Sequence, residues 1–97
     1  MSNNSGKIPV IIEKYEREHD LPDLKQTKYL FPNEFTFFDF SQIIRKKLIL
    51  PESQTISFFF SNGKLYQSTK TMREIYEENK DADGFLYCQY TCENRMG

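Results

Sequence analysis

The sequence has few of the residues that enzymes and metal sites need. It contains no tryptophan, one histidine, two cysteines and four glycines. One histidine and two cysteines match no recognised spacing of metal ligands, and four scattered glycines form no phosphate-binding loop. A nucleophilic enzyme needs a base within reach of its nucleophile, and His19 lies far along the chain from both Cys88 and Cys92. We therefore expect no enzyme, no metal and no cofactor.

An excess of charge of one sign is also missing. Thirteen basic and fourteen acidic side chains give a formal net charge of −1, which supplies no general attraction to nucleic acid. The longest apolar run, residues 8–12, is far shorter than the roughly 20 residues of a transmembrane helix. Residues 1–6 are polar and lack the charged and apolar regions of a secretory signal, so we expect reduced thiols in the cytosol.

Aromatic residues, by contrast, are abundant: nine phenylalanines and six tyrosines in 97 residues. Their spacing favours a buried core over a platform for stacking bases. Asn62 and Gly63 are typical of a type I′ hairpin turn, with a return strand over residues 64–66. Residues 15–26 are charged and predict a loop. Runs of β-branched and aromatic residues predict strands at residues 8–14, 28–31, 56–60 and 85–90.

Two capping boxes predict two helices. Thr36 and Asp39 begin the first, in which apolar side chains recur every three or four residues up to Leu48. Thr71 and Glu74 begin a second, shorter helix. The order strand, strand, helix, strand, helix, strand favours an α+β fold in which a mixed sheet packs on one main helix. The ubiquitin-like β-grasp fold uses this order.

Several segments recur together in a known family. In order they are KIPVIIEK (7–14), KYLFP (28–32), IIRKKL (43–48), FFF (58–60), IYEE (75–78), KDADGFLY (80–87), and Glu93-Asn94 before a final Gly97. The set resembles the autophagy ubiquitin-like modifiers, the family of the GABA-receptor-associated protein and the microtubule-associated light chains, over residues 7–97. The resemblance implies a flexible leader (1–6), a ubiquitin-like domain (7–90) and a flexible conjugation tail (91–97).

In that family the C-terminal glycine is activated with ATP, carried as a thioester and joined to phosphatidylethanolamine. The resemblance therefore implies conjugation through Gly97. It also implies three kinds of protein partner, which are the activating, transfer and deconjugating enzymes of the autophagy system. We expect a monomer that is cytoplasmic, and that lies on autophagosomal membranes once lipidated.

A second implied function is docking of cargo-receptor peptides with an aromatic-x-x-aliphatic motif, added as a strand beside residues 28–32. Alternation along that strand sends Lys28 and Leu30 one way and Tyr29 and Phe31 the other. By resemblance, the aromatic pocket comprises Pro9, Ile11, Lys28, Leu30 and Phe85. The aliphatic pocket comprises Phe31, Pro32, Phe35, Phe40 and Ile43. The basic residues that would meet acidic residues flanking the motif are Lys7, Lys28 and Lys47.

Three features differ from the family pattern. Six residues precede Lys7, where the family has two helices; the turn at Asn62 lacks a following proline pair; and Met96 replaces the aromatic residue that often precedes the glycine. A core role for Leu30, Phe40 and Ile43 is as plausible as a pocket role. Two alternatives stay open beside lipid conjugation: conjugation to a protein, and an unconjugated peptide-binding module. A thiol enzyme is least favoured.

Overall fold

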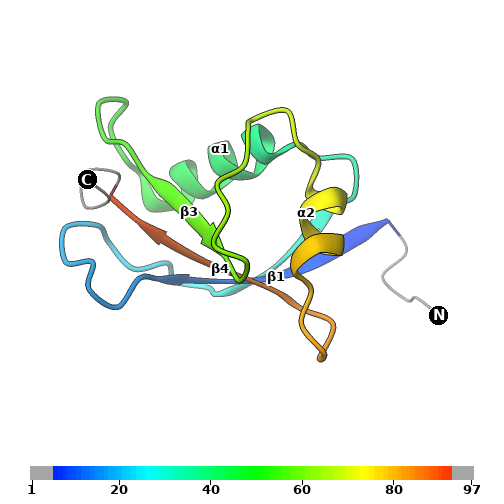
Figure 1. The fold of residues 1–97 in the computed structure, drawn as a ribbon. Helices are drawn as coiled ribbons and strands as arrows, with labels where there is room; N and C mark the ends of the chain where they lie inside the picture. Colours follow the sequence, from blue (N-terminus) through cyan, green and yellow to red (C-terminus); the bar gives the residue numbers. More distant parts are fainter. Residues whose placement is uncertain (1–5, 93–97) are drawn as a thin grey trace.

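The computed structural model describes residues 6–92, which form four strands and two helices (Figure 1). In the described residues no helix is both long and apolar enough to cross a membrane. The elements are β1 (Lys7–Lys14), β2 (Lys28–Pro32), α1 (Phe37–Leu48), β3 (Ser57–Phe60), α2 (Met72–Asn79) and β4 (Leu86–Thr91).

The strands form one mixed sheet in the order β2-β1-β4-β3. β1 pairs antiparallel with β2 and parallel with β4, and β3 pairs antiparallel with β4. Figure 1 shows α1 lying over one face of this sheet, with the shorter α2 beside it. The predicted α+β architecture, with a mixed sheet on one main helix and a second short helix, is confirmed. β2 and β3 are its two edge strands.

The phenylalanines build the core, as predicted. Phe40, in the first turn of α1, is fully buried. Its ring lies 5.2 Å from that of Phe31 on β2 and 5.0 Å from that of Phe58 on β3, measured between centroids. Edge-to-face ring pairs at such distances add to the free energy of burial. One residue of α1 thus contacts both edges of the sheet.

Both predicted capping boxes are present. The Thr36 hydroxyl accepts a hydrogen bond from the Asp39 N–H, and the Asp39 carboxylate accepts one from the Thr36 N–H. Thr71 and Glu74 make the same reciprocal pair at the start of α2. Each pair satisfies amide groups that have no partner inside the helix, which fixes where the helix begins.

The predicted return strand at residues 64–66 is wrong. The predicted type I′ turn is also wrong, because it needs a positive φ at both Asn62 and Gly63, and Asn62 does not have one. Gly63 has a φ of 75° and ends a turn that begins at Phe60, and β3 pairs with β4 alone in the described part of the sheet. Tyr66 turns inward instead: its ring lies 5.7 Å from that of Phe60, and its hydroxyl donates to Glu78 at 2.7 Å. Packing against α2 and the core replaces the hairpin ladder.

The last strand lies one residue later than predicted. β4 runs Leu86–Thr91, and both Thr91 and Cys92, expected in the tail, are buried. The reason is a contact distant in sequence, because the Thr91 hydroxyl and the Cys92 N–H both donate to the carboxylate of Glu18. The ordered fold therefore continues through Cys92.

The end of α1 generates a stability prediction. Ile49 caps the helix with φ of 56°, and its side chain is 86% exposed. A β-branched residue is strained in this left-handed region, where glycine is not. We expect Ile49→Gly to raise the free energy of unfolding by about 1 kcal/mol, measured by urea denaturation. The control Lys46→Gly, inside the helix, should lower it by about 1 kcal/mol; a loss in both variants would show that Ile49 is not strained.

Candidate functional site

β2 lies at the edge of the sheet, and two hydrogen bonds fix the direction of its backbone groups. The Asn33 N–H donates to the Gly6 carbonyl at 2.9 Å, and the Ile12 N–H donates to the Thr27 carbonyl at 2.8 Å. These two bonds belong to the same antiparallel register as the pairs of β1 with β2. In such a register, residues alternate between those bonded to the partner strand and those directed away from it.

The alternation assigns each backbone group of β2 to one side. Tyr29 and Phe31 lie in phase with Thr27 and Asn33, so their N–H and C=O groups face β1. Lys28 and Leu30 lie out of phase, so their N–H and C=O groups face away from the sheet. β2 therefore presents a free edge with two residues whose backbone groups can accept another strand.

One residue that the sequence did not single out contacts this free edge. The side-chain amide of Gln26 donates to the Lys28 carbonyl at 2.6 Å. This contact supplies a partner for an outward-facing acceptor. The sequence alone does not identify Gln26, because a glutamine two residues before the start of a strand is not a distinctive pattern. Its role follows once the structure shows that the Lys28 carbonyl faces outward.

The residues of the predicted aromatic pocket gather on the sheet face that points away from α1. The register pairs Pro9 with Leu30 and Ile11 with Lys28, and the Lys28 ammonium lies 5.0 Å from the centre of the Phe85 ring. Leu30 is 57% exposed although it is a large apolar residue. Pro9 is buried, and Ile11 and Phe85 are half-buried.

Phe31 and Phe35, from the predicted aliphatic pocket, lie on the opposite face of the sheet, near α1. The Phe31 ring is 6.3 Å from the Phe35 ring, and Pro32, Phe35 and Ile43 are half-buried. Phe31 and Phe40 belong to the core, so they can form only the floor of such a pocket. The structure thus brings Phe31, Phe35 and Phe40 together on the face toward α1, whereas Pro32 lies in phase with Leu30 on the other face of β2.

Tyr29 and Lys28 lie on β2, Lys7 on the neighbouring β1, and Lys47 in the last turn of α1. Tyr29 stacks on Phe31 with 6.0 Å between ring centroids, and partial burial raises the pKa of its hydroxyl. Lys7, Lys28 and Lys47 are exposed. Within residues 6–92, none of these three lysines forms an ion pair, so all three ammonium groups can meet an acidic partner.

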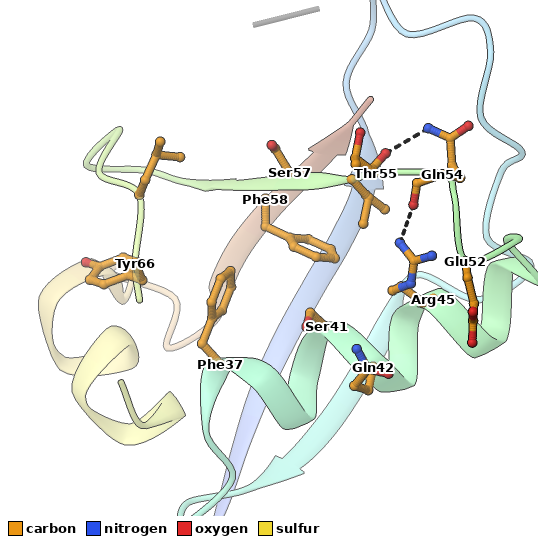
Figure 2. Close-up of a pocket in the computed structure, with 12 residues that line it drawn as sticks. Phe37, Ser41, Gln42, Arg45, Glu52, Gln54, Thr55, Ser57, Phe58 and Tyr66 are labelled. Carbon is orange, nitrogen blue, oxygen red and sulfur yellow. Dashed lines mark hydrogen bonds between the residues drawn. The ribbon is translucent and has the colours of Figure 1, made fainter. Parts of the chain in front are cut away.

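A further cavity lies along the other edge strand. It has a volume of about 490 Å³ and lies between α1, β3 and the chain around residues 52–57 (Figure 2). Phe37 and Phe58 provide its apolar surface. Arg45 also lines the cavity. Its guanidinium already has partners, because it donates to the backbone carbonyls of Gln54 at 2.6 Å and Pro51 at 2.8 Å. No predicted site residue lines it.

The two thiols lie inside the fold. Cys88 and Cys92 are unbridged, as predicted, and both are buried. Burial raises the pKa of the Cys88 thiol well above its ordinary value, which keeps it protonated and unreactive. His19 is exposed in the loop of residues 15–26. Among the described residues, no three metal-ligating side chains come together.

Gly97 lies outside the described residues, but the segment that leads to it is held by a buried carboxylate. Glu18 is 1% exposed. One of its oxygens accepts from the Thr91 hydroxyl at 2.7 Å and the Cys92 N–H at 2.8 Å; the other accepts from the N–H groups of Asp20 at 2.7 Å and Leu21 at 3.0 Å. The loop of residues 15–26 is thereby joined to the end of β4.

These bonds determine the ionisation of Glu18. Burial acts against the charged form, but the donors from Cys92, Thr91, Asp20 and Leu21 outweigh it and lower the pKa of this carboxyl from 4.5 to about 2. The folded state therefore holds the carboxylate more strongly than the unfolded chain does. The stabilisation is fully present above the unfolded pKa and is lost as the pH falls through the folded pKa.

This shift predicts an acid-dependent loss of stability between about pH 4.5 and pH 2. The contribution is on the order of 3 kcal/mol, and Glu18→Gln should remove most of this pH dependence. Urea denaturation at a series of pH values measures it. The control Glu16→Gln, on an exposed neighbour, should keep the wild-type profile. Equal profiles for wild type and Glu18→Gln would contradict the assignment.

Comparison with known proteins identifies the family. The family model described as "Autophagy protein Atg8 ubiquitin like" matches residues 1–97. The chain is 41% identical to human microtubule-associated protein 1 light chain 3 gamma over 92 residues, which are 95% of this chain and 63% of that protein. It is 45% identical to autophagy-related protein 8B of Oryza sativa subsp. japonica over 93 residues, covering 96% of this chain and 76% of that one.

A solved structure agrees. The crystal structure of Trypanosoma brucei ATG8 superposes with a TM-score of 0.82 at 31% identity, covering 92% of this chain and 75% of that one. The predicted ubiquitin-like fold is thereby confirmed, as is the resemblance drawn from the sequence. The chain spans less than two thirds of the human relative and about three quarters of the rice relative. This chain belongs to the Atg8 family of ubiquitin-like autophagy proteins.

Proposed function

We propose that this chain is a modifier that docks receptor peptides along β2 and is conjugated to phosphatidylethanolamine through Gly97. The observation that carries the docking proposal is the free edge of β2, where Lys28 and Leu30 direct backbone groups outward. An extended peptide pairs with these groups as a fifth strand. Before it does so, the Gln26 amide must leave the Lys28 carbonyl.

The geometry of a strand explains the spacing of the peptide motif. Successive side chains of a strand point to opposite faces, so two residues three apart lie on opposite sides. An aromatic-x-x-aliphatic peptide therefore directs its aromatic anchor to one face of the sheet and its aliphatic anchor to the other. The aromatic pocket, around Leu30, and the aliphatic pocket, around Phe35, lie on opposite faces of β2 and match this requirement. Lys7, Lys28 and Lys47 would pair with acidic residues beside the motif.

Leu30 offers the sharpest test of docking. We expect Leu30→Ala to weaken the binding of an aromatic-x-x-aliphatic peptide by about 2 kcal/mol, roughly 30-fold in Kd, because it removes apolar surface from the aromatic pocket. Isothermal titration calorimetry measures the change. Leu65→Ala is the matched control, since Leu65 is similarly exposed, at 67% against 57%, but lines the cavity beside β3. Unchanged affinity in folded Leu30→Ala would refute the placement of the pocket.

Conjugation would proceed by acyl transfer. The Gly97 carboxylate attacks the α-phosphorus of ATP and releases pyrophosphate; an enzyme thiol then attacks the acyl adenylate and releases AMP. In the last step the amine of phosphatidylethanolamine displaces the thiol and forms an amide. Glycine suits a narrow enzyme channel because it has no Cβ, and two acyl chains hold a protein on a membrane stably. Activating, transfer and deconjugating enzymes would be the partners, and the protein would move from the cytoplasm to autophagosomal membranes.

Substitution of Gly97 tests this step. We expect Gly97→Ala to abolish conjugation and leave the fold unchanged, because the last strand ends at Thr91, six positions earlier in the chain. Intact mass spectrometry of protein recovered from membranes of starved cells measures the product. A phospholipid-sized increment in the wild type alone is the expected result. A protein-sized increment would show conjugation to a protein instead, and no increment in the wild type would leave a peptide-binding module without conjugation.

A further inference from the structure

The hydrogen bonds between Glu18 and the end of β4 also fix the position of Cys92. The last residue pair of the sheet at this end joins Ser57 and Thr91, so Cys92 already lies beyond the ladder. Its N–H is held at 2.8 Å by Glu18, a residue 74 positions earlier in the chain. Within residues 6–92, the other polar contact of Cys92 is a 3.3 Å donation from the Gln54 side-chain amide to its sulfur, which is a weak acceptor.

The loop that carries Glu18 is itself fixed to the sheet. The Tyr15 N–H donates to the Tyr90 carbonyl at 2.9 Å, and the Tyr90 hydroxyl donates to the Pro22 carbonyl at 2.6 Å. Leu21 is 3% exposed within the core, and its carbonyl accepts from the Lys14 ammonium at 3.2 Å. Because both ends of the loop are attached to the sheet, Glu18 can act as a rigid support.

We propose that Glu18 is a positioning residue that clamps Cys92 and so sets the length of chain available to the enzymes that act on Gly97. The proposal rests on the proposed conjugation through that glycine. Five residues follow Cys92 in the sequence, and each extended residue spans about 3.4 Å, so the clamp limits the reach of Gly97 to roughly 17 Å. Release of Cys92 adds about one residue to that reach.

The test varies the length of the chain after Cys92 and measures the rate of thioester formation. Deletion of Asn94 shortens the reach by about 3.4 Å, and we expect it to lower the kcat/KM of thioester formation with an activating enzyme and ATP by at least about tenfold. In Glu18→Ala and in Glu18→Gln, the same deletion should cost less than about threefold, because neither side chain is the charged two-oxygen acceptor that holds Cys92, and the released residue compensates for the deleted one. Glu18→Gln keeps the size of the side chain, which guards against a failure of Glu18→Ala to fold.

A destabilised control separates the clamp from a general structural effect. Asn79 is buried, and its side-chain amide donates to the Ile75 carbonyl and the Tyr66 hydroxyl. Neither of these bonds involves Glu18. Asn79→Ala should be destabilised but should not rescue the Asn94 deletion. Equal sensitivity to the deletion in all backgrounds, or rescue by Asn79→Ala, would overturn the clamp.

Amide hydrogen exchange tests the hold of Glu18 on the Cys92 amide without any enzyme. The Cys92 amide should be protected in the wild type and should exchange at least about tenfold faster in Glu18→Gln, while the Phe31 amide stays protected in both. No change at Cys92 would overturn the proposal. A wild-type chain that shows this protection but takes no thioester would instead overturn the proposed conjugation, so the two failures are distinguishable.

Discussion

The burial of Phe40 beneath the sheet is the constraint on which the structure depends. This side chain is fully buried, and its ring meets those of Phe31 and Phe58, which lie on the two edge strands. α1 therefore packs against both edge strands on one face of the sheet. Within residues 6–92, no strand pairs with the outer edge of β2, and the proposed docking depends on this edge and on the side chains at its two faces.

An open edge strand is a hazard, because any extended segment can pair with it. β2 limits this hazard in ways that remain compatible with binding. The strand has only five residues, Lys28 places a charge on it, and Pro32 ends it without a donor. The Gln26 amide covers the Lys28 carbonyl, so a peptide gains that bond only in exchange for another. Binding would then depend on the two apolar anchors, which favours peptides that carry both.

The sequence predicted what is local and missed what is distant. The capping boxes at Thr36 and Thr71, and the alternation along β2, need only neighbouring residues, and the structure places them as predicted. The hairpin failed because Tyr66 packs against Phe60. The hold of Glu18 on Cys92 spans 74 residues and has no local pattern. The pocket residues came from family resemblance, and the alternation along β2 explains why Leu30 and Phe31 lie on opposite faces of the strand.

The central claim is that β2 receives a peptide as an added strand, and amide hydrogen exchange at single-residue resolution tests it most directly. In the free protein, the amides of Tyr29 and Phe31 should be protected by β1, and those of Lys28 and Leu30 should exchange rapidly. Saturation with an aromatic-x-x-aliphatic peptide should protect an outward amide, Leu30 first, and leave Phe31 unchanged. New protection along β3, with none at β2, would contradict the account.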